Sequence, residues 1–369
     1  MKRFFGMVAI AATAAILAGC ATTGKRAEIP TTLIAQGAMA HSSPLRYWGD
    51  DPQFAASHTR VKPGSDGAVD FLTISGGGIN GAYGAGYLMG WTASGNRPEF
   101  EVVTGISVGA ITAPLAFLGT AYDNRLYEVY QSLGAATNPK TNFLSVIFGG
   151  TAAVDNTPVK AAIAKAVDAQ ILDKIGAEHR AGRRLYVGTT NLDAQRPVVW
   201  DIGAIANSND PNRLELVRSV ILASASVPTV FDPVLLEVNS SGQAYSEMHV
   251  DGGVTEQVLL MPGGWGKVGK NARLYVIFNG VVDAQTETVQ PNSVALVARS
   301  VPTLLKYLGR ANLAQLATSA RQSGVHYRMT AIPGDFPESS SVFGDPVWLA
   351  QLYDFGHAHG KAGSWRDRN

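Results

Sequence analysis

From residue 69 onward, short apolar runs alternate with stretches of helical periodicity, and this alternation constrains the fold most strongly. Strands are expected at Val69–Ile74, Glu101–Thr104, Leu185–Thr189, Val198–Trp200 and Leu274–Phe278. Helices are expected from the glycines after Ile74 to Trp91, after Ser107, over Thr157–Arg180, from Asp210 to Ala223, and over Asn292–Ser323 with a break or kink at Pro302. Strands alternating with helices predict an α/β fold of three layers, α/β/α, with a mainly parallel central sheet and helices on both faces.

Composition and charge exclude several classes of protein. The 30 Lys and Arg residues against 29 Asp and Glu residues give a net charge of +1, so no basic field exists to attract nucleic acid. One cysteine cannot form an internal disulfide. The chain has no cysteine pair, no His-Glu-x-x-His sequence and no acidic calcium loop, so we expect neither a metal nor a cofactor.

The N-terminus has the pattern of an export signal. Met1-Lys2-Arg3 is basic, and the apolar stretch Phe4–Leu17 is shorter than the roughly 20 residues that a membrane-spanning helix needs. The segment ends Leu17-Ala18-Gly19-Cys20, which resembles the processing box of bacterial lipoproteins. That resemblance implies cleavage before Cys20 and lipidation of its thiol. The alternative is a plain signal peptide with a chance cysteine.

These patterns divide the chain into four segments. Residues 1–19 are expected to be a lipoprotein signal peptide, and 20–68 a lipidated tether, which carries several prolines and no sustained period. Residues 69–360 are expected to form one α/β domain, and 361–369 a C-terminal tail. Residue 21 is alanine rather than aspartate, which by analogy with lipoprotein sorting favours attachment to the outer membrane of a bacterial cell envelope.

A glycine cluster, Ser75-Gly76-Gly77-Gly78-Ile79-Asn80-Gly81, stands between an expected strand and an expected helix. Glycines allow a tight turn and can direct free backbone N–H groups to one spot beside a helix N-terminus. Such a nest can hold a phosphate or a developing oxyanion, and the sequence leaves both open. The cluster also satisfies the dinucleotide pattern G-x-G-x-x-G, with Glu99 or Glu101 about 20 residues on. Alternatively, the glycines serve only close helix–strand packing.

A second glycine motif, Gly105-Ile106-Ser107-Val108-Gly109, has the form G-x-S-x-G. It follows an expected strand and precedes a helix-compatible stretch. This context suits a nucleophilic serine, because Ser107 would occupy a sharp corner where the flanking glycines, Gly105 and Gly109, remove clashing side chains. The sequence therefore predicts that Ser107 is a nucleophile.

A serine nucleophile needs a base, and two kinds of residue are available. Histidine is the usual base, and the chain has His41, His58, His179, His249, His326, His357 and His359. The last three fall late in the chain, where an α/β-hydrolase carries its histidine, but none has a local signature. The other candidate is the aspartate of Asp251-Gly252-Gly253. By itself this sequence is most often a turn, but burial would raise the pKa of the aspartate toward useful basicity.

Taken together, the motifs resemble those of the patatin-like phospholipase family. Gly76-Gly77-Gly78-Ile79-Asn80-Gly81 resembles its glycine-rich oxyanion block, and Gly105–Gly109 its nucleophile elbow. Ala223-Ser224-Ala225-Ser226-Val227-Pro228 resembles its Ala-Ser…Pro block, and Asp251-Gly252-Gly253 its aspartate motif. One departure is Ser75, where many members have aspartate.

The resemblance implies a Ser107–Asp251 dyad without histidine, and an oxyanion hole of backbone N–H groups in Gly76, Gly77 and Gly78. Gly81, Gly105, Gly109, Gly252 and Gly253 support these motifs. The family resemblance also implies hydrolysis of lipid acyl esters through an acyl-enzyme, without calcium. Membrane lipids are the expected substrate and, through Cys20, the expected anchor. No catalytic role is expected for Ser224 or Ser226.

Three other hypotheses remain at this point. The first is an esterase with a Ser–Asp–His triad, and the second is a dinucleotide-dependent oxidoreductase, which would leave Ser107 and Asp251 unexplained. The third is a lipoprotein that binds lipid or a partner without turnover.

Overall fold

The computed structural model describes residues 26–35, 45–51, 61–135, 155–240, 242–259, 271–339 and 345–367. The expected signal peptide, Cys20, His41 and His58 lie outside these ranges. Within them, no helix combines the length and apolar character that crossing a membrane requires.

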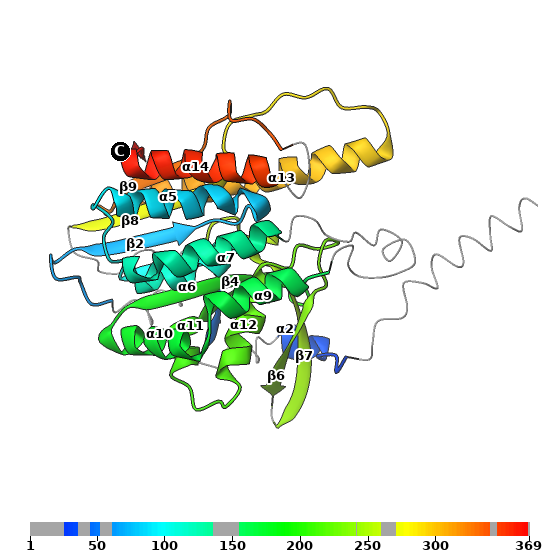
Figure 1. Ribbon diagram of the computed structural model, residues 1–369. Helices are drawn as coiled ribbons and strands as arrows, with labels where there is room; N and C mark the ends of the chain where they lie inside the picture. The colour runs from blue at the N-terminus through cyan, green and yellow to red at the C-terminus, as the bar shows by residue number, and fades with distance from the viewer. Residues whose placement is uncertain are drawn as a thin grey trace, which may run out of the picture.

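The described strands form one sheet, shown in Figure 1. The strands are β1 (Arg46–Trp48), β2 (Val69–Ile74), β3 (Val102–Ile106), β4 (Arg184–Asn191), β5 (Arg196–Asp201), β6 (Val234–Ser240), β7 (Gln243–Asp251), β8 (Ala272–Val281), β9 (His326–Ile332) and β10 (Arg366–Asp367). Their order is β1-β5-β4-β3-β2-β8-β9-β10, and β7 pairs with both β4 and β6. The central strands β4, β3, β2, β8 and β9 are parallel, and the outer ones are antiparallel.

Helices cover both faces of the sheet, which confirms the three-layer α/β/α fold. They are α2 (Thr31–Ala35), α5 (Gly81–Ala93), α6 (Val108–Leu118), α7 (Asp123–Ala135), α9 (Thr157–Ala166), α10 (Ala169–Ala181), α11 (Ile202–Ala206), α12 (Arg213–Ser224), α13 (Ser293–Gln322) and α14 (Pro346–Ala362). Alternate strand residues point to opposite faces. Leu72 and Ile74 join the core beneath α5, α6 and α14, whereas Phe71 joins a second core beneath α13.

Two helices differ from their sequence-based predictions. The stretch expected as one helix over Thr157–Arg180 is two helices, α9 and α10. Val167 is extended, and the Asp168 side chain accepts a hydrogen bond from Ile171 N–H (2.8 Å), which begins a new helix. In contrast, Pro302 does not break α13, which is helical on both sides of it.

Close packing of α5 against α14 depends on glycines. A Cβ atom added at Gly90 would lie 1.9 Å from the His357 carbonyl oxygen, and one at Gly360 would lie 2.0 Å from the Tyr87 carbonyl oxygen. Both distances are too short for any side chain. The two helix backbones therefore approach each other directly, and α14 fixes the position of α5, whose first residue, Gly81, belongs to the glycine cluster.

A strand from the expected tether joins the sheet. β1 pairs with β5 and forms one edge of the sheet. The Arg46 guanidinium makes a buried ion pair with Glu247 of β7. Glu247 also contacts His249, whose other ring nitrogen lies 3.0 Å from the Thr189 hydroxyl. Residues 46–48 are therefore connected to the strand that ends at Asp251 by a chain of buried polar contacts.

Candidate active site

Ser107 and Asp251 meet at one edge of the sheet. Ser107 follows the last residue of β3, and Ile106 in that strand pairs with Gly188 of β4. Asp251 is the last residue of β7 and pairs with Thr189 of the same β4 strand. The sheet register therefore brings both predicted catalytic residues to adjacent positions of β4. This edge carries the carboxyl ends of the parallel strands, where ligands bind in open α/β sheets.

The backbone at Ser107 has the geometry of a strained strand-to-helix corner. Its φ is 57° and its ψ is −126°, a conformation rare for a residue with a side chain, and α6 begins at the next residue. A Cβ atom added at Gly105 would lie 2.4 Å from the Gly109 carbonyl oxygen, and one at Gly109 would lie 2.3 Å from that of Ile74. Both flanking glycines are thus required for the turn.

The Asp251 carboxyl is buried and poorly solvated. Its Oδ1 atom accepts a hydrogen bond from Gly253 N–H at 2.7 Å, whereas Oδ2 has no partner at hydrogen-bonding distance among the described residues. Burial raises the pKa of Asp251 from 3.8 to about 6, and this effect outweighs the lowering by the Ser107 hydroxyl and Gly253 N–H. The Ser107 hydroxyl thus lies close enough to the Asp251 carboxyl to lower its pKa.

The glycine cluster forms a loop beside Ser107. Gly77 and Gly78 have φ values of 151° and 55°, and a Cβ atom added at Gly77 would lie 2.1 Å from the Asn279 carbonyl oxygen. The Gly76 N–H donates to the Gln257 carbonyl at 3.1 Å, so it is not free to bind an oxyanion. The N–H groups of Gly77 and Gly78 make no hydrogen bond within the described residues. The predicted donor set of three glycines is thus reduced to two.

Ser75, the departure from the family pattern, holds this loop to β8. Its hydroxyl accepts a hydrogen bond from Asn279 N–H at 2.7 Å, and its carbonyl accepts one from the Asn279 side chain at 3.0 Å. The same hydroxyl donates to the Gly76 carbonyl at 2.6 Å. The serine hydroxyl therefore fixes the loop through two hydrogen bonds, and the backbone carbonyl of the same residue adds a third.

A buried segment at the end of α12 connects Ser107 with Asp251. The Ser224 hydroxyl accepts a hydrogen bond from Ser107 N–H at 2.9 Å and donates one to the Gly188 carbonyl at 2.6 Å. Two residues on, the Ser226 carbonyl accepts a hydrogen bond from Asp251 N–H at 2.9 Å. No catalytic role is expected for Ser224 from the sequence, and nothing local in the sequence indicates that its hydroxyl reaches a residue 117 positions away.

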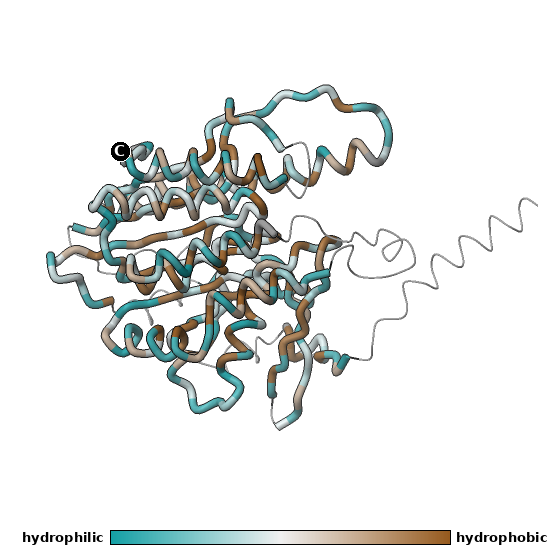
Figure 2. Tube along the Cα trace, in the orientation of Figure 1, coloured by the Kyte–Doolittle hydropathy of each residue, from teal (hydrophilic) through white to brown (hydrophobic). Residues whose placement is uncertain are grey.

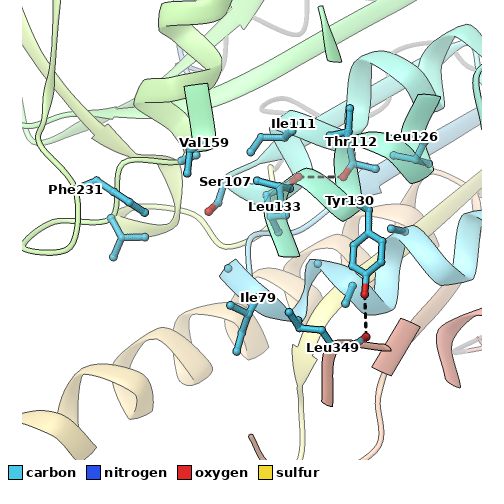
Figure 3. Close-up of a pocket in the computed structure, with 18 of the residues that line it drawn as sticks. Ile79, Ser107, Ile111, Thr112, Leu126, Tyr130, Leu133, Val159, Phe231 and Leu349 are labelled. Carbon is cyan, nitrogen blue, oxygen red and sulfur yellow. Dashed lines mark hydrogen bonds between the residues drawn. The ribbon is translucent and has the colours of Figure 1, made fainter. Parts of the chain in front are cut away.

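Ser107 opens into an apolar cavity of about 260 Å³, shown in Figure 3. Its walls come from the glycine cluster, α5, α6, α7, α9, the segment after α12 and α14, and they include Ile79, Ile111, Leu126, Leu133, Val159, Phe231 and Leu349. Two other hydroxyls line the cavity, and both are engaged. Thr112 donates to the Val108 carbonyl at 3.1 Å, and Tyr130 donates to the Leu349 carbonyl at 2.9 Å. The cavity therefore suits an alkyl chain, with Ser107 at its polar end.

The described histidines lie elsewhere. His249 is fully buried between Thr189 and Glu247, and burial lowers its pKa. His326 is exposed at the first residue of β9, the opposite edge of the sheet. His179 is paired with Asp201, and His357 and His359 pack on aromatic rings of α14.

The structure does not assemble a dinucleotide site or a metal site from the described residues. Glu101 is buried at the start of β3, where it accepts a hydrogen bond from Asp70 N–H (2.6 Å), whereas the glycine cluster follows the end of β2. The required acidic residue is thus at the wrong edge of the sheet. No group of three or more His, Cys, Asp or Glu side chains in the described ranges is placed to hold a metal ion.

Comparisons with known proteins give one family match. The family described as patatin-like phospholipase matches residues 72–262, which include Ser107, Ser224 and Asp251. No curated protein matches. Among solved structures, VipD from Legionella pneumophila is similar at 10% sequence identity, over 85% of this chain and 71% of that one. The TM-score of this likeness is 0.35.

Proposed function

The chain belongs to the patatin-like phospholipase family, and on that premise we propose that it is a serine acyl hydrolase with a Ser107–Asp251 dyad. Family membership supports lipid acyl hydrolysis in general. The observation that carries the finer proposal is the placement of a buried carboxyl of raised pKa beside a strained serine at the end of an apolar cavity. The substrates are acyl esters of membrane lipids, cleaved as by a phospholipase A or a lysophospholipase.

In the first half of the reaction, Ser107 Oγ attacks the ester carbonyl carbon and Asp251 accepts the hydroxyl proton. The carbonyl oxygen becomes an oxyanion, and the free N–H groups of Gly77 and Gly78 are the donors that stabilise it. When the tetrahedral intermediate collapses, the C–O bond to the alcohol breaks. The alcohol takes the proton from Asp251 and leaves, and the acyl group remains on Ser107.

In the second half, water replaces the alcohol. Asp251 accepts a proton from the water as its oxygen attacks the acyl carbon, and the same two N–H groups hold the new oxyanion. Collapse breaks the bond to Ser107 Oγ, which recovers the proton from Asp251. The products are a free fatty acid and the regenerated enzyme.

A dyad fits the described residues better than a triad with histidine. In a triad, a histidine would lie between the serine and the acid. Asp251 instead neighbours Ser107 without an intervening ring, and His249, the histidine nearest in sequence, is held by Thr189 and Glu247. We therefore assign the base role to Asp251.

We also propose that the protein is anchored to the bacterial outer membrane by lipid on Cys20. The proposal is supported by the sequence that ends in Cys20, the only cysteine of the chain. Cys20→Ser should abolish incorporation of a palmitate analogue in growing cells and leave Ser107 reactive toward a fluorophosphonate. Label that persists on the variant would contradict lipidation at this residue.

Product analysis tests the activity. The protein is incubated with mixed phospholipids, and the products are identified by mass spectrometry, with Ser107→Ala as the control. We expect free fatty acid and lysolipid from the wild type and neither from the variant. Lipid binding without products, together with no fluorophosphonate label on Ser107, would indicate a non-catalytic lipid-binding protein instead.

A further inference from the structure

The amino-terminal half of α13 carries large apolar side chains that are exposed. Leu304 is 69% exposed and Val297 is 63% exposed, and Leu296, Val301 and Tyr307 are also exposed. Buried positions begin only at Gly309, where a Cβ atom would lie 2.8 Å from the Phe278 ring. Figure 1 shows this half of α13 projecting past the body of the protein, and Figure 2 shows hydrophobic residues along it.

The residues of this half-helix are arranged in two stripes. At about 100° per residue, the five exposed apolar side chains fall within an arc of roughly 140°, and Arg299, Lys306 and Arg310 fall within roughly 40° on the other side. The sequence of α13 contains no aspartate or glutamate. Arg299 is paired with Glu287 of the preceding segment, and Lys306 contacts Gln285 of the same segment. The preceding segment therefore lies on the side of the cations, and the apolar stripe stays exposed.

The projecting half-helix joins the body of the protein beside the glycine cluster and the loop after Asp251. Where α13 reaches the sheet, Asn312 Oδ1 accepts a hydrogen bond from Gln257 N–H at 2.8 Å. The carbonyl of Gln257 accepts the hydrogen bond from Gly76, and its side chain donates to the Gly253 carbonyl at 2.8 Å. A single residue thus connects α13 to the glycine cluster and to the loop after Asp251. In Figure 1 the half-helix extends in the direction in which β2 points, toward the edge that carries Ser107.

We propose that this half of α13 is the surface that docks on the phospholipid bilayer, with its apolar stripe inserted among the acyl chains. The stripe of apolar residues beside cations, without acidic residues, is typical of helices that lie in a membrane interface. Arg310, whose guanidinium lies over the ring of Tyr307 in the stripe, would contact lipid phosphates. The inference rests on the proposed function, because docking here would bring the edge with Ser107 to its lipid substrate.

Insertion is measured at a single labelled position, independently of catalysis. In a full-length Cys20→Ser chain, Leu304→Cys supplies the only thiol for an environment-sensitive fluorophore. A matched control places the thiol at Thr318, an exposed position in the other half of α13. Vesicles of phosphatidylethanolamine and phosphatidylglycerol should shift the emission at 304 to the blue, and nitroxide-bearing lipid should quench it. The label at 318 should change little.

The second arm separates docking from chemistry. Val301→Ser combined with Leu304→Ser should lower the hydrolysis of vesicle phospholipid at least tenfold. Hydrolysis of a short-chain ester that is monomeric in water should stay within about twofold, because neither residue lines the cavity. Circular dichroism confirms that the variant is folded.

The outcomes are distinguishable. No blue shift or quenching at 304, or equal effects at 304 and 318, would overturn the docking proposal whatever the activity. A concentration-dependent shift without lipid would show that a second copy of the chain covers the stripe, which also overturns it. Failure of the proposed function would instead appear as no hydrolysis of either substrate by the wild type, while the fluorescence result would still stand.

Discussion

At the scale of single residues, the site places a strained serine against an acid that burial makes basic. The Ser107 backbone departs from ordinary φ and ψ values, and Asp251 keeps one oxygen atom without a partner among the described residues. Both features cost folding free energy, and both are useful to a nucleophile and its base. The surrounding core must therefore hold them in place.

The raised pKa of Asp251 predicts the pH dependence of the reaction. The base must be ionised in the free enzyme, so kcat/KM should fall as pH decreases through about 6 and be flat above it. The measurement is kcat/KM for a water-soluble ester between pH 4.5 and 8, with the folded state verified at each pH. A profile that is flat down to pH 4.5 would exclude Asp251 as a base with this pKa.

The pH dependence of the free energy of unfolding tests the raised pKa of Asp251 independently of catalysis. The folded state binds the Asp251 proton more tightly than the unfolded chain, whose carboxyl titrates near 3.8, so ionisation costs the folded state roughly 3 kcal/mol. This cost develops as pH rises from about 4 to 6. Asp251→Asn should therefore gain stability relative to the wild type over that interval, as measured by urea unfolding.

Ser224 is predicted to be a positioning residue. Ser224→Ala would leave the Ser107 N–H without the hydroxyl that accepts its hydrogen bond and would remove a hydrogen bond to the Gly188 carbonyl, and a buried group left unsatisfied costs about 1–3 kcal/mol. Because one of these groups belongs to the nucleophile, kcat should fall at least tenfold with little change in KM.

The matched control is Ser226→Ala. Its hydroxyl bonds only to the Leu222 carbonyl, and its own carbonyl, which holds Asp251, is retained. Turnover by this variant should stay near that of the wild type. Equal losses of kcat in the two variants, or a loss for Ser224→Ala that only follows its lower stability, would contradict the positioning role.

At the scale of elements, the cavity depends on helices that the glycines bring together. α7 contributes Leu126 and Tyr130 to the cavity wall, and α14 contributes Leu349. The Tyr130 hydroxyl donates to the Leu349 carbonyl and connects these two helices directly. The position of α14 against α5 therefore determines the shape of the cavity into which Ser107 opens.

Gly90→Ala tests this arrangement. The added methyl group would overlap the His357 carbonyl, so α5 and α14 must separate, with a loss of about 1–3 kcal/mol in unfolding free energy. Ala358→Met, on the exposed side of α14, is the control and should be nearly neutral. Thermal unfolding measures both. A Gly90→Ala protein as stable as the wild type would show that the close approach is not required.

At the scale of the whole molecule, local sequence patterns predicted the separate motifs, whereas the order and register of the strands bring those motifs together. The two glycine motifs could be read from the sequence because a strand–turn–helix corner needs glycine at fixed positions. The split between α9 and α10 was not predicted, because the apolar spacing continues across Val167 and Asp168. The contact between Ser224 and Ser107 could not be predicted from the sequence, since it joins segments far apart in the chain.

The position of Asp251 shows most clearly which feature of the site local sequence patterns do not predict. Asp-Gly is common in turns, and the sequence by itself offered Asp251 only as one candidate base beside the histidines, until the resemblance to a family favoured it. In the structure, β6 and β7 form a hairpin, and β7 pairs antiparallel with β4, which delivers Asp251 to the residue opposite Thr189. No local pattern encodes that pairing. A non-local strand register thus places the proposed base, Asp251, beside the proposed nucleophile, Ser107.

The dyad is tested most directly by turnover of Ser107→Ala, Asp251→Asn and the double variant on one phospholipid. Each single substitution should lower kcat by several orders of magnitude, and the double variant should lose little more, because the two residues act as one unit. Alanine at His249, His326, His357 or His359 should cost far less. A folded His326→Ala or His357→Ala protein as inactive as Ser107→Ala, or an Asp251→Asn protein with near-normal kcat, would contradict the Ser107–Asp251 dyad.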